Sequence, residues 1–349
     1  MACLARRPLL AALAALAVPA RAQTGAREVR DAAGRVAILP ARITRVFPAG
    51  PPASILIWSL APDLLAGWPG RGLRPAELAF MAPEAAALPT LGRLTGRDNT
   101  ANMEAVLAQR PDLVLDYGSI APTYVSLADR VRAQTGLPVL LLDGTLRNIP
   151  QTYRLLGEIL DRRQVAEDLA TRAEAILAAA EDSAAALRAK GRPRVLYVRG
   201  PRGTEAGLAG SITAEIMEFV GAENVARGDG GSMAQISAEQ ALAWDPDWLI
   251  GIDPAFAAFA LQDPVWRLLR AVREGRFVIV PTLPYGWVDF PPSVNRLLGL
   301  VWLPSLFRQE KAEALVGPLT ELYARLFHRR PEPAQIAALL RAAFPTQQG

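Results

Sequence analysis

Residues 164–190 read QVAEDLATRAEAILAAAEDSAAALRAK, and no glycine or proline occurs between Gly157 and Gly191. The stretch is rich in Ala, Leu, Glu and Arg, which are strong helix formers. A helix of about 27 residues would be roughly 40 Å long, which is the width of a whole domain. We therefore predict that this helix joins two lobes; the alternative is a long surface helix within one domain. Its apolar residues recur at steps of three and four, which predicts one buried stripe: Val165, Leu169, Ala173, Ile176 and Ala180.

The segments before and after this helix contain a repeat that aligns without gaps. Residues 102–115 (NMEAVLAQRPDLVL) match residues 237–250 (SAEQALAWDPDWLI). Each copy starts with a capping residue, runs for two helical turns, breaks at Pro-Asp and enters an apolar strand. The repeat predicts two pseudo-symmetric α/β lobes with small, mostly parallel sheets. The identical pairs are Glu104/Glu239, Leu107/Leu242, Ala108/Ala243, Pro111/Pro246 and Asp112/Asp247.

The first 22 residues have the features of a secretory signal peptide. Arg6 and Arg7 precede an apolar run at 9–18, and Ala20-Arg21-Ala22 forms a small-x-small cleavage site. The apolar run is shorter than the roughly 20 residues that a membrane span needs. Cys3 precedes the run, so it is not placed as the lipid-acceptor cysteine of a lipoprotein. We expect a periplasmic protein with this organisation: signal peptide 1–22, N-terminal lobe 23–162, interlobe helix 163–190 and C-terminal lobe 191–349.

Cleavage would leave a mature chain without cysteine, because Cys3 is the only one. This excludes disulfides, thiolate metal sites and a cysteine nucleophile. Removing Arg6, Arg7 and Arg21 lowers the formal net charge from +4 to +1 (4 − 3), since residues 1–22 contain no acid. The basic pI therefore gives no reason to expect nucleic-acid binding. A site for a bare transition metal usually needs several imidazoles or thiolates, and His328, expected at the surface, is the only histidine.

Motifs typical of enzymes are absent from the sequence. It contains no Gly-x-Ser-x-Gly elbow, no Gly-x4-Gly-Lys-Ser/Thr phosphate loop and no His-Glu-x-x-His. A Ser-His-Asp triad would have to use His328. We predict a protein that is not an enzyme, with a carboxylate-based secreted hydrolase and a non-transport sensor or adaptor as the alternatives.

Three motifs carry a resemblance to a known family. They are the Asn-x-Glu-x-x-Leu-x-x-x-Pro-Asp-Leu-Val motif at 102–114, the opening segments 29–36 and 42–46, and PPSVNRLLG at 291–299. With these motifs the chain resembles, over residues 27–345, the substrate-binding proteins of bacterial ABC importers for ferric siderophores and vitamin B12. The resemblance implies two lobes on one long helix, and a monomer that delivers a small-molecule metal complex to an ABC permease and its ATPase. It implies no resident cofactor and no resident metal.

The resemblance also implies that the ligand lies in a cleft between the lobes, and open α/β sheets bind ligands at the carboxyl ends of their strands. The loops expected there are 48–52, 117–119, 199–204 and 284–290. The favoured ligand is a ferric siderophore; molybdate or tungstate, cobalamin and haem remain alternatives. The candidate ligand-binding residues in these loops are Tyr117, Gly118, Arg199, Arg202, Tyr285 and Trp287.

The candidate side chains suit such a ligand, although each also has a structural explanation. The aromatic cluster of Tyr285, Trp287 and Phe290 would cover flat apolar parts of a metal chelate; the alternative is that Trp287 and Phe290 pack under the C-terminal helices. Arg199 and Arg202 would neutralise an anionic ligand, or be ordinary surface arginines. Tyr117 would contact the ligand, or be a half-buried loop aromatic.

Glu104 and Glu239 each fall at the second position of the short helix that the two copies of the repeat predict. The resemblance implies that one acid on each lobe docks on arginines of the permease. The alternative for both is a favourable interaction with the helix dipole.

Overall fold

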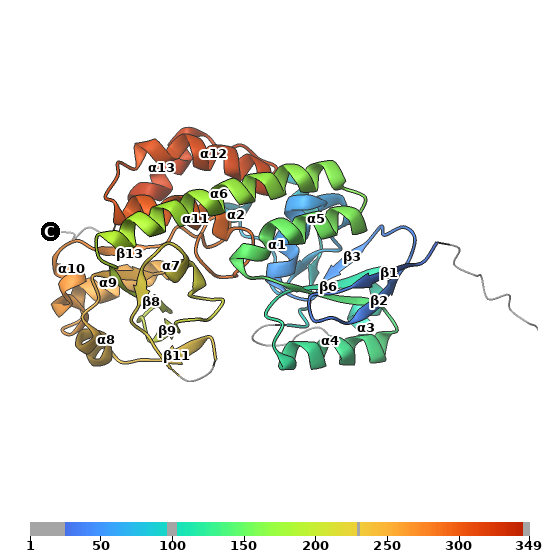
Figure 1. The fold of residues 1–349 in the computed structure, drawn as a ribbon, viewed down its shortest axis with the longest axis horizontal. Coiled ribbons are helices and arrows are strands. Elements are labelled where there is room, and N and C mark those ends of the chain that lie inside the picture. Colours follow the sequence, from blue (N-terminus) through green and yellow to red (C-terminus); the bar gives the residue numbers. More distant parts are fainter. Residues whose placement is uncertain (1–24, 96–102, 229–230, 345–349) are drawn as a thin grey trace, which may run out of the picture.

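The computed structural model describes residues 25–95, 103–228 and 231–344 and shows two α/β lobes along one long helix (Figure 1). Helix α6, Arg163–Ala189, runs along the upper side of both lobes (Figure 1). The predicted two-lobed α/β fold is therefore confirmed. The predicted signal peptide lies outside the described residues and stays a prediction.

The buried face of α6 differs from the predicted stripe. Val165 is 41% exposed and Ile176 is only partly buried. The true stripe is made mostly of alanine, which lets α5 (Ile149–Ile159) pack close: a Cβ added to Gly157 would lie 2.3 Å from the Ala166 Cβ. The buried residues of the helix are Ala166, Leu169, Ala170, Ala173, Leu177, Ala180 and Ala184.

The N-terminal lobe is built on a parallel three-stranded sheet with the order β3-β6-β7. An antiparallel hairpin, β1-β2, and a short parallel pair, β4-β5, lie beside it. Its strands are β1 Arg27–Arg30, β2 Val36–Leu39, β3 Val46–Pro48, β4 Trp68–Pro69, β5 Thr90–Leu91, β6 Leu113–Gly118 and β7 Val139–Asp143. Its other helices are α1 Pro51–Leu60, α2 Pro75–Leu78, α3 Met103–Ala108 and α4 Pro122–Thr135, with 3-10 turns η1 Pro62–Leu64, η2 Pro83–Ala87 and η3 Leu146–Asn148.

The C-terminal lobe has a six-stranded sheet with the order β11-β9-β8-β12-β13, and β10 also pairs with β8. The β10, β8, β12 and β13 pairings are parallel, whereas β9 and β11 form an antiparallel edge. Its strands are β8 Arg194–Arg199, β9 Glu205–Gly207, β10 Glu223–Asn224, β11 Met233–Gln235, β12 Trp248–Gly251 and β13 Phe277–Ile279. Its helices are α7 Glu215–Phe219, α8 Ala238–Trp244, α9 Pro254–Gln262, η4 Trp266–Leu268, α10 Arg270–Arg273, α11 Arg296–Phe307, α12 Glu313–Phe327 and α13 Pro333–Ala342.

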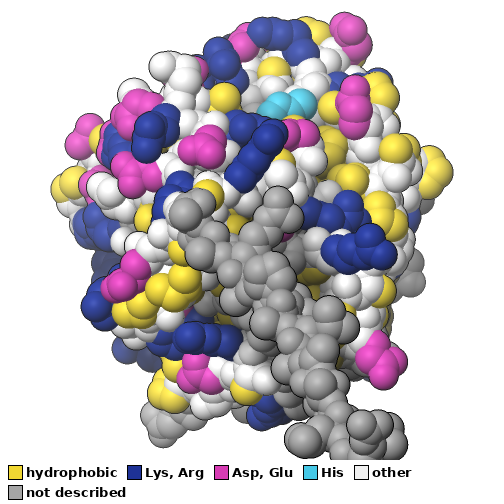
Figure 2. Space-filling model, turned by 90° about the vertical axis from the view of Figure 1, so that its right-hand side faces the viewer, with side chains coloured by type: hydrophobic (Ala, Val, Ile, Leu, Met, Phe, Trp, Pro, Cys, Tyr) yellow, Lys and Arg dark blue, Asp and Glu magenta, His cyan; other side chains and the backbone are white. Residues whose placement is uncertain are grey.

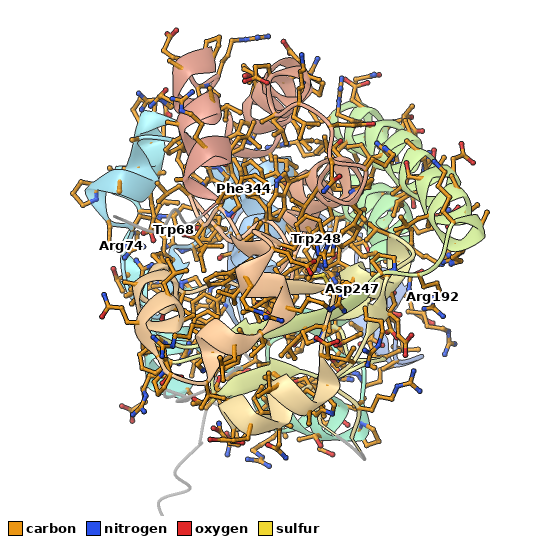
Figure 3. The ribbon with its side chains drawn as sticks, turned by 90° about the vertical axis from the view of Figure 1, so that its left-hand side faces the viewer. Trp68, Arg74, Arg192, Asp247, Trp248 and Phe344 are labelled. Atoms are coloured by element: carbon orange, nitrogen blue, oxygen red, sulfur yellow. The ribbon has the colours of Figure 1, made fainter. Side chains whose placement is uncertain are left out.

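The sequence repeat corresponds to the same unit in both lobes, α3–β6 and α8–β12. The aspartate of each Pro-Asp pair clamps the start of the neighbouring strand. Asp112 Oδ2 accepts hydrogen bonds from the Thr44 and Arg45 amides, and Asp247 Oδ2 accepts one from the Arg194 amide. In return, the Asp112 amide donates to the Arg45 carbonyl and the Asp247 amide to the Arg194 carbonyl. Figure 3 labels Asp247 beside Trp248 at the start of β12. Pseudo-symmetry thus extends to individual hydrogen bonds.

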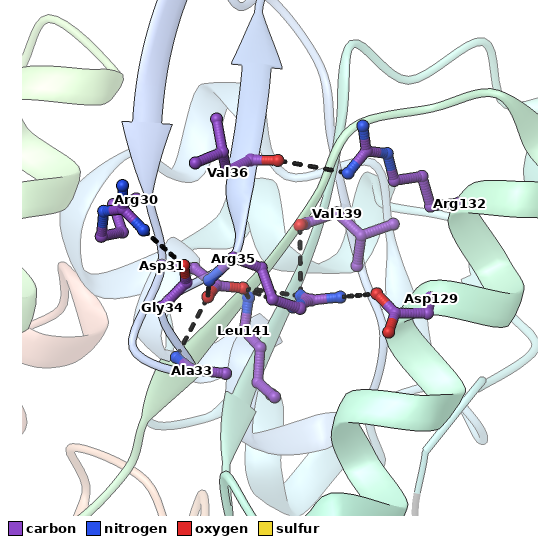
Figure 4. Close-up of polar contacts among 10 residues, drawn as sticks. All are labelled: Arg30, Asp31, Ala33, Gly34, Arg35, Val36, Asp129, Arg132, Val139 and Leu141. Carbon is purple, nitrogen blue, oxygen red and sulfur yellow. Dashed lines mark hydrogen bonds and ion pairs between the residues drawn. The ribbon is translucent and has the colours of Figure 1, made fainter.

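The N-terminal hairpin is tied to the free edge of the lobe sheet by a buried acid. Asp31, 6% exposed, accepts from the Leu141 amide of β7, while the Ala32 amide donates to the Leu141 carbonyl. Arg35 joins the Asp31 carboxylate to Asp129 on α4, as Figure 4 shows. The hairpin therefore covers an edge strand that would otherwise be open to pairing.

The C-terminal helices return to the N-terminal lobe, which the predicted boundary at residue 191 did not foresee. The Ala82 amide donates to the Phe327 carbonyl at the end of α12, and the ring of His328 forms a hydrogen bond of 2.8 Å to the Trp58 carbonyl. Figure 1 shows α12 above both lobes, alongside α6. The lobes are therefore joined by α6 through the chain and by α12 through packing.

On the outer end of the N-terminal lobe, basic and acidic side chains are interspersed (Figure 2). Among the described residues, none of the helices combines the length and apolarity needed to cross a bilayer.

Candidate ligand-binding site

The loops at the carboxyl ends of the two sheets meet at the boundary between the lobes. The Ser293 hydroxyl, which follows the 284–290 loop, donates to the Pro52 carbonyl at 2.7 Å. In the same region Arg296 donates to the Gly144 carbonyl, just after β7. Segments that follow β3, β7 and β13 therefore contribute to this boundary.

Arg199, at the end of β8, is held in one orientation by a buried acid. Its Nη2 pairs with Oδ2 of Asp289, a side chain with no accessible surface, and the Tyr197 hydroxyl donates to the same oxygen at 2.9 Å. Burial alone would lower the pKa of Arg199, but Asp289 outweighs burial and raises it. The guanidinium is therefore fixed as a cation, with its side chain 15% exposed.

Phe290 is the exposed aromatic of this region, at 64% exposure. The Arg199 guanidinium lies 5.5 Å from the centre of its ring. Phe290 has φ +65°, a left-handed conformation that a bulky side chain rarely adopts and that costs of order 1–3 kcal/mol. A strained, exposed aromatic beside a fixed cation is a surface suited to binding.

The other candidate arginine points elsewhere. Arg202 is exposed and its guanidinium lies 5.2 Å from the centre of the Phe259 ring, on α9 of its own lobe. The structure therefore does not bring Arg202 together with Arg199 and Phe290.

Tyr285 and Trp287 face the core in this structure. Trp287 has no exposed surface; its indole N–H donates to the Tyr323 hydroxyl at 2.8 Å and its ring packs edge-on against Trp302. Tyr285 is half-buried against Phe327, and burial raises its pKa. Trp287 thus follows the alternative of packing under the C-terminal helices, whereas for Phe290 that alternative is wrong, because Phe290 is the residue of this loop that reaches the surface.

Tyr117 and Gly118 lie at the base of the lobe boundary. Tyr117 is 1% exposed, and burial raises its pKa while the nearby Arg296 acts in the opposite direction. Gly118 packs backbone against backbone with Gly144, whose amide donates to the Gly118 carbonyl at 2.8 Å. A Cβ added to Gly144 would lie 2.7 Å from the Gly118 Cα. Tyr117 is therefore a buried aromatic, whereas the lack of a side chain at Gly144 allows the two strand ends to approach closely; a Cβ added to Gly118 would meet nothing within 4 Å.

A buried acid precedes this pair. Asp116 is 6% exposed, and burial raises its pKa to about 6, against the opposing effect of hydrogen bonds from the Thr95 hydroxyl and the Tyr117 amide. Thr95 in turn lies against Gly50, at the start of α1. The group can therefore gain or lose a proton near neutral pH.

Glu104 and Glu239, the predicted docking acids, are both exposed on short helices of opposite lobes. Both helices lie away from α6 in Figure 1. Hydrogen bonds from its own backbone amide and from Ser237 lower the pKa of Glu239. Their role in docking stays a prediction.

Within the described parts of the chain, His, Asp and Glu side chains form no cluster of three or more arranged to hold a metal ion. The residues that the candidate set did not single out are Asp289, Phe290 and Arg296. Arg296 carried a signal in the sequence, because it is the one charge within the apolar run RLLGLVWLP that forms α11.

Comparison with known proteins identifies the family. The family model described as "Periplasmic binding protein" matches residues 83–282, more than half of the chain. The chain belongs to the periplasmic binding protein family. The predicted resemblance is therefore confirmed, and binding proteins of this type serve ABC transporters, together with permease and ATPase components.

Individual members of the family share this fold at low sequence identity. An ABC transporter solute-binding protein from Sulfurospirillum deleyianum is 24% identical, with a TM-score of 0.82 over 90% of this chain and 99% of that one. The molybdate-binding protein MolA of Haemophilus influenzae is 25% identical over 71% of this chain and 75% of its own. A periplasmic heme-binding protein from Pseudomonas aeruginosa is 23% identical, with a TM-score of 0.58 over 77% and 94%. These relatives are transport proteins, not enzymes.

Proposed function

We propose that this periplasmic binding protein captures an anionic metal chelate, of the ferric siderophore class, at the lobe boundary and delivers it to an ABC permease. The observation that carries the proposal is the pairing of exposed Phe290 with the fixed cation of Arg199. A metal chelate presents both an aromatic or aliphatic surface and negatively charged oxygens. Phe290 would stack on the first, and the remaining donors of Arg199 would bind the second.

The opposite lobe supports a ligand with apolar surface. Ile120, two residues beyond Gly118 at the end of β6, is 38% exposed. A tetrahedral oxyanion has no apolar surface and gains nothing from such side chains. In addition, α1 begins with Pro51 and Pro52, so two of its first amides have no N–H to offer an anion.

A second candidate ligand is molybdate, which the similarity to MolA favours. In that case Arg199 would bind the oxyanion directly, and Phe290 would only shield it from water. The two ligands therefore differ in how strongly binding depends on Phe290.

The test is a calorimetric titration of the purified chain with ferric tris-catecholate, ferric hydroxamate, ferric citrate, haem, cobalamin and molybdate. Loss of an aromatic stacking contact and its buried area corresponds to roughly a tenfold weaker Kd. We expect one iron chelate to bind at sub-micromolar Kd and Phe290→Ala to weaken it about tenfold. Phe344→Ala, which removes an exposed phenylalanine near the C-terminus, is the matched control.

Arg199→Gln should weaken the same chelate, while Arg227→Gln, which breaks an exposed pair with Glu223, should not. Tight molybdate binding that is insensitive to Phe290→Ala would keep the transport role and overturn the proposed ligand. If no compound of the panel bound, the ligand proposal would fail as a whole.

A further inference from the structure

Arg296, the first residue of α11, is a fully buried cation at the junction of the two lobes. Its Nη1 lies 2.9 Å from Glu215 Oε2 on α7, and the same nitrogen donates to the Ile212 carbonyl at 3.1 Å. Its Nε donates to the Ser293 carbonyl at 3.3 Å. These partners belong to the C-terminal lobe. The remaining nitrogen, Nη2, crosses to the N-terminal lobe and donates to the Gly144 carbonyl.

Glu215 crosses the same junction in the opposite direction. While Oε2 pairs with Arg296, Oε1 accepts a hydrogen bond of 3.0 Å from the Leu146 amide of the N-terminal lobe. Each member of the ion pair therefore holds its partner in one lobe and a backbone group of the other. Segment 144–146 is bound at two points, once as an acceptor and once as a donor.

A third contact extends the junction to the surface. Arg147, 70% exposed, places its guanidinium 4.9 Å from the centre of the Phe219 ring at the end of α7. Leu146 and Arg147 of the N-terminal lobe thus contact the short helix α7 of the C-terminal lobe, and Gly144 contacts Arg296 at the start of α11. The candidate residue Gly118 packs directly on Gly144, so any shift at this junction moves the strand end beside the candidate site.

We propose that Arg296 is a positioning residue for ligand capture, which together with Glu215 fixes the angle between the two lobes. A buried ion pair of this kind is a weak source of net stability compared with an apolar pair, but in some proteins such pairs specify one arrangement of their surroundings. The two terminal nitrogens of Arg296 reach Glu215 and the Gly144 carbonyl at the same time only at one lobe separation. That separation sets the size of the ligand that can touch Phe290 and the β6 end together. The statement about ligand size rests on the proposed function, whereas the statement about the lobe angle does not.

The test measures the lobe angle without a ligand. In the full chain with Cys3→Ser, spin labels are attached at Arg130→Cys on α4 and Ala243→Cys on α8, both exposed positions in opposite lobes. Electron–electron double resonance then gives the distribution of distances between the labels. We expect one narrow distribution for this chain and a distribution at least about twice as wide, or a shifted mean, for Arg296→Gln.

Glu215→Gln keeps the size of a partly exposed side chain, removes the ion pair and should give the same broadening. Arg154→Gln removes the ion pairs between Arg154 on α5 and Glu167 and Glu174 on α6. It should leave the distribution unchanged. Folded Arg296→Gln and Glu215→Gln proteins with the narrow parental distribution would overturn the proposal. A purely structural role would lower the melting temperature without moving the labels.

A measurement on the unmodified chain covers the case in which the variants do not fold. If the junction persists in solution, the Leu146 amide exchanges its hydrogen at least about a hundredfold more slowly than exposed loop amides. Exchange at the rate of exposed loop amides would also overturn the proposal. Because neither readout needs a ligand, their failure is distinct from a failure of the titration panel.

Discussion

The pairing of Arg199 with Asp289 predicts a large, non-additive loss of stability when either charge is removed. Asp289 has no accessible surface, and the Arg199 side chain is 15% exposed. Breaking a buried ion pair by removing one partner costs about 3–5 kcal/mol, because the other charge stays buried without compensation. Since Arg199 retains some contact with water, we expect Asp289→Asn to cost about 3 kcal/mol, at the lower end of this range.

Arg199→Gln should cost a similar amount, because the Asp289 carboxylate would keep only the hydrogen bond from the Tyr197 hydroxyl. Its other oxygen, Oδ1, is buried and has no hydrogen-bond partner among the described residues. The double variant removes both charges at once and should cost little more than either single change. The coupling free energy expected from the cycle is therefore about 3 kcal/mol.

The assay is guanidinium chloride unfolding at pH 7, followed by the fluorescence of the seven tryptophans. Arg227→Gln, which breaks the exposed pair with Glu223, is the control and should hardly change the midpoint. Additive effects of the two single changes, within about 0.5 kcal/mol, would refute the reasoning. The charges of Arg199 and Asp289 would then not be coupled in the folded protein, and the role of Arg199 would be ligand binding alone.

Three further predictions concern stability. Burial raises the pKa of Asp116 from 3.8 to about 6, so the charged carboxylate lowers the free energy of unfolding as pH rises through that window. Asp116→Asn should therefore raise the denaturant midpoint at pH 7 and flatten its dependence on pH. An unchanged pH profile would argue against a buried carboxylate at this position. Burial alone would raise the pKa of Glu77, but Arg71 and Arg74 hold it at about 2. The stabilisation is therefore complete above pH 4.5 and lost toward pH 2, so Glu77→Gln should lower the melting temperature at pH 7 but not at pH 2. Gly144→Ala forces a Cβ to within 2.7 Å of the Gly118 Cα and should cost about 1–3 kcal/mol in thermal melting; a neutral effect would mean that the two strand ends move apart easily.

The sequence was most informative where one segment repeats another. The Pro-Asp pairs at 111–112 and 246–247 predicted a helix–strand break in each lobe, and both occur. The shared aspartate has a physical reason, since Asp112 and Asp247 clamp the neighbouring strand in the same way. A local pattern could reveal this because the helix, the break and the strand are contiguous in sequence.

Patterns that depend on distant partners were less reliable. The predicted stripe of α6 followed its larger residues, yet the helix buries alanines because α5 approaches so closely at Gly157. Similarly, the aromatic residues of the 285–290 loop are alike in sequence. Trp287 is the core aromatic because it bonds to Tyr323, a partner 36 residues later in the chain, whereas Phe290 is exposed. A local sequence pattern does not reveal this difference.

The links between the lobes determine how a ligand can be captured. A large opening would have to break the backbone hydrogen bond between Ala82 and Phe327 and the buried contacts of Arg296 with Gly144. Hydrogen bonds that involve a charged group contribute about 1.5–3 kcal/mol each, and a buried group left without a partner costs a similar amount. A small rotation preserves all of these contacts. On the proposed function, selection among ligands would therefore depend on side chains that are already in place, such as Arg199 and Phe290, rather than on a wide closing motion. The strained backbone of Phe290 agrees with this, because strain that is built into the free protein pre-organises the surface that meets the ligand.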